Sequence, residues 1–228
     1  MKAEELFSLP DEFLFRSFFS PDDAPWEWIR KIKDSFDACG VSPNPDTFPS
    51  LSSGVVVDGP VYIDRSAKIG PNVVINGPAY IGPMTELRPG AFLRGNVIIG
   101  EACVVGNSSE LKNCMLLNHV QVPHFNYVGD SILGNGVHLG AGVICSNLRL
   151  DRTKIPVKLP AGYVDSGLVK LGAMIGDETE VGCNAVLNPG TILGKRSLVY
   201  PCMSFGGYLD ADAIAAPKQQ EVRTIRRR

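Results

Sequence analysis

The chain carries only three histidines, and two of them, His119 and His124, lie five residues apart. Two imidazoles at a short spacing can ligate a metal ion, and one imidazole with a pKa near neutrality can act as a general base. A zinc site needs three protein ligands, yet the third histidine, His138, lies downstream and none precedes the pair. The spacing therefore leaves a metal site open as an alternative but favours a site without a metal.

Three long cationic side chains, Arg88, Arg94 and Lys112, recur at multiples of six residues. Phosphate groups need fixed cations, and the arginine guanidinium offers two parallel donors for them. A further basic run ends the sequence, at Arg223 and Arg226–Arg228. That run is expected either to be solvated or to lie near the phosphates of a ligand.

Composition excludes several classes of protein. With 228 residues, 44% of them hydrophobic, the chain can bury a core, and a formal net charge of −2 argues against a nucleic-acid binder. Because the start is acidic, we expect no secretory signal, and no apolar run is long enough to span a membrane. Six cysteines without a C-x-x-C pair are expected to be free thiols in a reducing cytoplasm.

The aliphatic residues repeat every six positions. From Val57 to Leu117 every sixth residue is Ile, Leu or Val, and the period resumes from Val169 to Val199. A period of six matches no helix, because 3.6 residues per turn would scatter those side chains around the cylinder. It does match short strands joined by tight turns, and each unit buries so little that neighbouring coils must stack.

This pattern resembles the hexapeptide-repeat acyltransferases, which fold as left-handed parallel β-helices with three hexads in each triangular coil. The resemblance implies an all-β solenoid of about 22 hexads, hence about seven coils. At about 4.8 Å per coil the prism would be about 34 Å long. The left hand comes from the resemblance alone, since ordinary crossovers are right-handed.

Residues 1–54 lack the period and are expected to form a small α-helical N-terminal cap and linker. A first helix is predicted to start at Ser8-Leu9-Pro10, and a second to run from about Pro25 to Ala38. We expect them to cover the open strand edges of the first coil. Docking of a partner protein is the alternative role.

The remaining boundaries follow from where the period stops. The β-helix is expected over residues 55–207, followed by a C-terminal tail at 208–228. Residues 148–168 interrupt the period, so they are expected to leave the solenoid as an extruded loop. That loop is either a solvated surface loop or an arm that reaches a neighbouring subunit.

A closer resemblance covers under a third of the chain. It is to the acetyltransferase half of the bifunctional enzymes that make UDP-N-acetylglucosamine, which acetylates glucosamine-1-phosphate with acetyl-CoA. The L-R-P-G-A and H-x-x-Y-x-G-D strings are more specific than the hexad itself. The matching segments are Gly82–Ala91, Val105–Lys112, His124–Asp130 and Gly140–Asn147.

Carried over by position, the resemblance implies that His124 is the general base. It implies that Arg88 and Lys112 bind the sugar phosphate and that Tyr127 and Asn147 contact the sugar. The chemistry is coherent, because an amine must lose a proton as it attacks a thioester, and a base with a pKa near 7 can accept that proton. Backbone N–H groups would hold the oxyanion.

Other positions depart from that family. His138 stands where the family has a substrate-contacting Asn, and Lys154 aligns only loosely with a loop lysine that binds substrate. At the positions that contact acetyl-CoA in the family, this chain has Cys183, Tyr200 and Pro201. We keep all five as candidate site residues, with acetyl-CoA as the co-substrate and no required metal.

The cations also bear on assembly. Arg94 and Lys112 are 18 residues apart, one coil, so they are predicted to stack on one edge, whereas Arg88 lies on another. A homotrimer can bring two such edges to one ligand, and the resembled family is trimeric with sites between subunits. The expected partners are a sugar phosphate, further copies of the chain and a separate nucleotidyltransferase, with no nucleic acid and no membrane.

Two rival functions remain at this point. One is a catalytically silent β-helix that binds sugar phosphates or serves assembly, which the Tyr200-Pro201 departure favours and the His124/Tyr127 string opposes. The other is a metal enzyme like the γ-class carbonic anhydrases, which share the fold and use three histidines, two of them five residues apart. Metal analysis of purified protein and an assay of CoA release distinguish the three functions.

Overall fold

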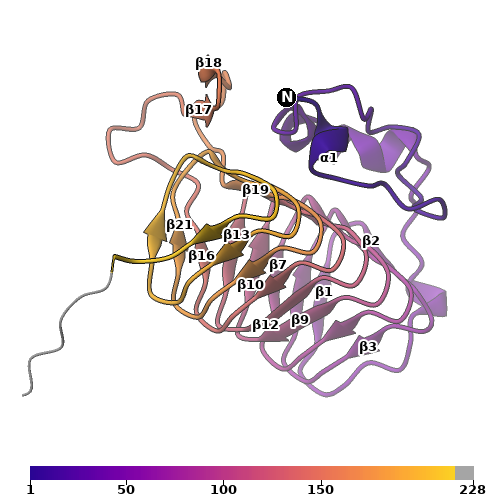
Figure 1. Cartoon of the computed structure of the whole chain (residues 1–228). Coiled ribbons are helices and arrows are strands. Elements are labelled where there is room, and N and C mark those ends of the chain that lie inside the picture. The colour runs from indigo at the N-terminus through magenta and orange to yellow at the C-terminus, as the bar shows by residue number, and fades with distance from the viewer. Residues whose placement is uncertain (219–228) are drawn as a thin grey trace, which may run out of the picture.

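A computed structural model describes residues 1–218; the C-terminal basic run lies outside them. The chain winds around one axis as a triangular solenoid (Figure 1), and each of its three faces is a parallel eight-stranded sheet. The first sheet contains β1 (Val56–Asp58), β4 (Val74–Asn76), β7 (Phe92–Arg94), β10 (Glu110–Lys112), β13 (Tyr127–Gly129), β16 (Ile144–Cys145), β21 (Val186–Leu187) and β24 (Ser204–Phe205).

The other two sheets have the same order along the axis. The second sheet contains β2 (Val61–Ile63), β5 (Ala79–Ile81), β8 (Val97–Ile99), β11 (Cys114–Leu116), β14 (Ile132–Leu133), β19 (Ala173–Ile175), β22 (Thr191–Leu193) and β25 (Tyr208–Leu209). The third sheet contains β3 (Lys68–Ile69), β6 (Glu86–Leu87), β9 (Val104–Asn107), β12 (Gln121–His124), β15 (His138–Leu139), β20 (Glu180–Val181), β23 (Leu198–Val199) and β26 (Ile214–Ala215).

The register explains the six-residue period. Val57 pairs with Ile75 and Ile75 with Leu93, so successive coils are 18 residues apart and each aliphatic residue lies over the next. These side chains fill the interior as one continuous buried column. The predicted parallel solenoid is therefore confirmed, with eight strands on each face where about seven coils were expected. Its left-handed sense stays a prediction.

The N-terminal segment, residues 1–54, contains one α-helix and two short 3-10 helices, η1 (Ala3–Glu5) and η2 (Pro45–Thr47). The helix α1 (Glu27–Ala38) confirms the second predicted helix. The first predicted helix is wrong, because turns follow Ser8-Leu9-Pro10. Phe13 and Phe15 are both buried, and one helix face could not bury side chains two residues apart.

The N-terminal segment lies mainly along the side of the solenoid, which corrects the expected cap. Its aromatic residues pack on the outer surface of the second sheet, where the ring of Phe15 meets the ring of Tyr80 at 5.2 Å. Only its last part covers the first coil: Asn44 bonds the backbone of Ile63, and Phe48 packs against the solenoid core. The apolar outer surface of the second sheet explains this placement, since water would otherwise contact it.

The inserted segment, residues 148–168, leaves the solenoid between β16 and β19 as an antiparallel hairpin, β17 (Pro156–Leu159) and β18 (Gly162–Asp165). Ile155 and Val157 are buried with the N-terminal segment, and Arg30 Nη2 donates to the Ser166 carbonyl at 2.8 Å. Both segments lie over the same side in Figure 1.

The strands of the solenoid continue to Ala215, past the predicted boundary at residue 207. No helix among residues 1–218 is long and apolar enough to cross a membrane.

Candidate functional site

Three of the predicted site residues meet at one end of β10 and β13. The ammonium of Lys112 lies 3.0 and 3.2 Å from the two carboxylate oxygens of Asp130. The Asn147 amide donates to that carboxylate and, at 3.2 Å, to the Tyr127 hydroxyl. Asn113 adds a third donor to Asp130 at 2.7 Å. We call these five residues the polar cluster.

Asp130 is the residue that the sequence analysis did not single out. Its side chain is 4% exposed, and it joins Lys112 and Asn113 of the preceding coil to Asn147 of the following coil. Asp130 holds a left-handed backbone conformation (φ 48°) at the corner after β13, where Asp and Asn are tolerated better than most residues. The available signal was its place at the end of the H-x-x-Y-x-G-D string.

Gly129 makes room for the polar cluster. A Cβ at this position would lie 2.5 Å from the Tyr127 hydroxyl and 2.7 Å from the Asn147 amide nitrogen. The Tyr127 side chain can therefore lie along the first sheet and reach Asn147. Burial raises the pKa of the Tyr127 phenol, and the hydrogen bond from Asn147 opposes that shift, so the hydroxyl is protonated near neutral pH.

Arg94 and Lys112 stand at the ends of neighbouring strands of the first sheet, as their spacing predicted. Arg94 Nη1 lies 2.6 Å from Glu110 Oε1, and this pair is close enough to influence the Tyr127 phenol. The first sheet thus presents two cations, each beside a carboxylate. Arg88 lies after β6 on the third sheet, where its Nε is 3.3 Å from Glu86 Oε1, so the predicted separation of the cations is also found.

His124 is the last residue of β12 on the third sheet and is exposed. Phe125, which is 60% exposed and left-handed (φ 52°), turns the chain from the third sheet to the first. The buried Asn126 fixes this corner by accepting the His124 backbone N–H at 3.0 Å. His124 and Tyr127 therefore stand on either side of one corner of the prism.

The remaining predicted residues form a second group on the third sheet. His138, Cys183, Tyr200 and Pro201 line one open groove of about 510 Å³, which we call the third-sheet groove. His138 Nδ1 lies 2.7 Å from Glu180 Oε2 across neighbouring strands. Tyr200 and Pro201 line this groove and do not fill it. Its lining also includes Gly140 and Gly182, where a Cβ would meet Cys183 and Pro201 of the next coil.

Lys154 stands apart from both groups. It lies in the inserted segment, is 63% exposed, and its Nζ is 4.0 Å from Asp165 Oδ2. The single chain therefore gathers Lys112, Tyr127 and Asn147 in one place and His138 with the CoA-position residues in another. His124 and Arg88 share the sheet of the second group.

No group of three or more His, Cys, Asp or Glu within residues 1–218 is placed to hold a metal ion. His119 lies at a corner between the second and third sheets with φ 60°.

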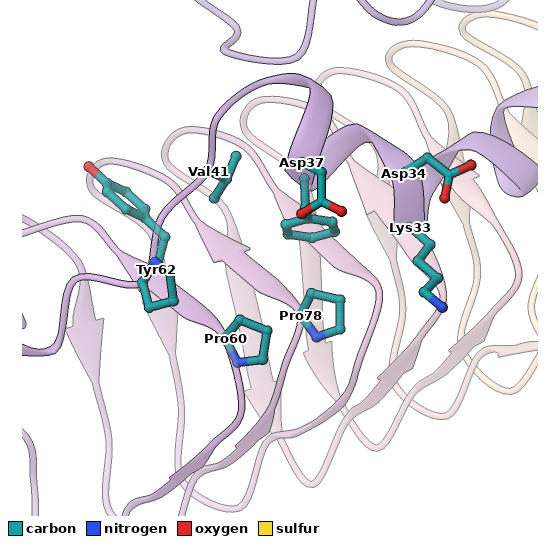
Figure 2. Close-up of a pocket in the computed structure, with 9 residues that line it drawn as sticks. Lys33, Asp34, Asp37, Val41, Pro60, Tyr62 and Pro78 are labelled. Atoms are coloured by element: carbon teal, nitrogen blue, oxygen red, sulfur yellow. The ribbon is translucent and has the colours of Figure 1, made fainter.

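A separate pocket of about 260 Å³ lies between α1 and the start of the second sheet, where Asp37 and Val41 face Pro60 and Pro78 (Figure 2). None of the predicted site residues lines that pocket.

Comparison with known proteins shows which family and which relatives the solenoid resembles. The family described as the GMPPB C-terminal domain matches residues 75–199, more than half of the chain. A bifunctional sugar-1-phosphate nucleotidylyltransferase/acetyltransferase of Sulfurisphaera tokodaii is 34% identical over 177 residues, which are 78% of this chain and 43% of the relative. The bifunctional protein GlmU of Methanocaldococcus jannaschii is 36% identical over 172 residues, 75% of this chain and 41% of the relative.

The chain spans less than half the length of these curated relatives. The matched region runs from β4 to β23 and includes the polar cluster, His124 and almost all of the third-sheet groove. By this match, the chain belongs to the family of the GMPPB C-terminal domain.

Proposed function

We propose that this chain is an acetyl-CoA-dependent N-acetyltransferase that acts on an amino-sugar phosphate such as glucosamine-1-phosphate. The observation that carries the proposal is the polar cluster. It sets the Lys112 ammonium, the Tyr127 hydroxyl and the Asn147 amide side by side on one sheet, with the exposed His124 across the corner. The name of the Sulfurisphaera tokodaii relative, a bifunctional sugar-1-phosphate nucleotidylyltransferase/acetyltransferase, agrees with it.

In the proposed reaction, the His124 imidazole accepts a proton from the substrate amine while the amine nitrogen attacks the thioester carbonyl carbon. The carbon–sulfur bond then breaks, and the sulfur leaves as CoA and takes up a proton. Lys112 and Arg88 hold the phosphate by charge, which fixes the amine relative to the base. Tyr127 and Asn147 bind the sugar by hydrogen bonds.

The third-sheet groove is where we place acetyl-CoA. The groove is open, two glycines are among its lining residues, and Leu198 and Tyr200 add apolar surface to it. A pantetheine arm is a narrow chain with few charges, and such a chain fits a groove of about 510 Å³ that is mostly apolar with a few polar groups. His138, on this interpretation, lies beside the co-substrate and not beside the sugar, where its position in the sequence had predicted it.

We propose a homotrimer because one chain keeps the two groups apart. His124 and Arg88 lie on the third sheet and the polar cluster on the first, so one prism presents them on different sides. Placing the first sheet of one copy against the third sheet of the next would bring both to one ligand, with His124 at the interface between subunits. Sedimentation velocity of the full chain tests this assembly, and a monomer at assay concentration would contradict it.

The experiment that tests the activity is CoA release from acetyl-CoA with glucosamine-1-phosphate, with the acetylated product identified by mass. Glucose-1-phosphate, which has no amine, is the control acceptor and should give no product. We place the reaction in a reducing cytoplasm, which agrees with six free cysteines. Absence of turnover together with absence of CoA binding would reject the proposal in favour of a catalytically silent sugar-phosphate-binding β-helix.

A further inference from the structure

The carboxylate of Asp130 determines which groups the polar cluster can offer a ligand. An ionised carboxylate only accepts hydrogen bonds, so every group that contacts it must turn a donor toward it. Lys112, Asn113 and Asn147 all do so, and the carboxylate is almost fully buried among them. The orientation of each of these side chains is therefore set by Asp130.

The consequence is sharpest at Asn147. Its amide nitrogen donates both to Asp130 and to the Tyr127 hydroxyl, and an amide nitrogen has only two hydrogens to give. The amide oxygen of Asn147 is the group left for a ligand, and it can only accept. Because the Tyr127 oxygen accepts from Asn147, the Tyr127 hydrogen is free to donate outward.

We propose that Asp130 is a positioning residue that makes the site recognise an N–H donor on the substrate through the amide oxygen of Asn147. This inference rests on the proposed function and deepens it. The cluster then presents one acceptor for the amine beside two donors, Tyr127 and Lys112, for the oxygen-rich remainder of an amino-sugar phosphate. Without Asp130 the Asn147 amide could turn over and present donors in place of its oxygen.

Asp130→Asn is the direct test, because Asn has nearly the same shape and tolerates the left-handed backbone of this corner. Its amide can donate as well as accept, so it no longer fixes Asn147, and Lys112 loses its counter-charge. Titration calorimetry with glucosamine-1-phosphate and with 2-deoxyglucose-1-phosphate, which lacks the amine, measures the preference for the donor. We expect the wild-type preference to fall about ten- to a hundredfold in this variant.

Asp177→Asn is the matched control. Asp177 is also a buried carboxylate beside a lysine, with Lys195 Nζ at 3.2 Å, and it accepts backbone N–H groups of Ser8 and Asn135. It lies at another corner, against the N-terminal segment. Losing its charge should cost comparable stability and leave the preference between the two sugar phosphates unchanged, which separates positioning from a purely structural role.

Two further measurements keep the inference falsifiable. Asn147→Ala leaves the Asp130–Lys112 pair in place and should lose the same preference as Asp130→Asn. The side-chain amide of Asn147, observed by NMR in the full chain, should exchange with water more slowly in the wild type than in Asp130→Asn. An unchanged preference in both variants overturns the inference alone, whereas a wild-type chain that binds neither sugar phosphate overturns the proposed function and this inference with it.

Discussion

Replacing Gly129 by alanine should damage activity far more than stability. The added Cβ would lie 2.5 Å from the Tyr127 hydroxyl, whereas ordinary contacts begin at 3.4 Å, so the hydroxyl must retreat by about 0.9 Å. The Asn147–Tyr127 hydrogen bond is already 3.2 Å long and would break. In a site that depends on the placement of its groups, an error of about 1 Å can cost about a hundredfold in rate.

The cost in stability is much smaller. Losing one hydrogen bond between neutral groups costs about 0.5–1.5 kcal/mol. Gly129 is not in the left-handed region, so alanine restricts the unfolded chain and returns about 0.4–1 kcal/mol. The two contributions nearly cancel, and the free energy of unfolding should change by no more than about 1 kcal/mol.

The assay is kcat/KM for CoA release with glucosamine-1-phosphate, beside a urea denaturation curve. Gly206→Ala is the matched control, because Gly206 follows β24 of the same first sheet and its Cβ would meet Asn188 Cβ at 3.2 Å, away from the polar cluster. We expect about a hundredfold loss in kcat/KM for Gly129→Ala and almost none for the control. A Gly129→Ala enzyme within about twofold of the wild type would refute the importance we give to the Tyr127–Asn147 contact.

Three further outcomes follow from burial and exposure. His124→Ala should lower kcat by about 10²- to 10⁴-fold without moving the melting temperature, since the side chain is exposed, and unchanged activity would remove it as the base. Burial raises the pKa of Cys103 and Cys145 to about 12. Above about pH 9 the unfolded chain releases thiol protons that the folded chain keeps, so the free energy of unfolding should fall as the pH rises. A urea midpoint that stays constant from about pH 8 to about pH 11 would contradict this. Phe15→Ala should lower the free energy of unfolding by about 3–5 kcal/mol, because the ring is fully buried against Tyr80. Urea denaturation followed by tryptophan fluorescence measures this loss. A loss below about 1 kcal/mol would mean that the N-terminal segment folds independently of the solenoid.

The solenoid could be predicted because its signal is local and repeated. Each coil needs an aliphatic residue such as Ile75 or Leu93 at a fixed place, and the same requirement recurs every six residues. The placement of the N-terminal segment had no such signal. Phe15 packs on Tyr80, 65 positions away in the sequence, and the spacing of aromatic residues within the segment does not reveal which surface they cover.

The site was partly predictable for a related reason. Tyr127 and Asn147 lie in strings that resemble a known family, and both were expected to contact the sugar. Asp130 accepts hydrogen bonds from donors 17 and 18 residues away, in the neighbouring coils. The sequence of a single coil therefore does not reveal these contacts. The same holds for His138 and Cys183, whose common groove depends on the 42-residue step between β15 and β20 that the inserted segment creates.

The placement of the N-terminal segment limits how this column can grow into larger structures. The outward side chains of β5, β8, β11, β14, β19, β22 and β25 are all taken up by that segment together with the base of the hairpin. One lateral side of the triangle is thus wrapped by the molecule's own chain, and two remain bare. In the proposed homotrimer, contacts between bare sides would turn each copy by a fixed angle relative to the last and close into a ring, which leaves the wrapped side of every copy outside those contacts.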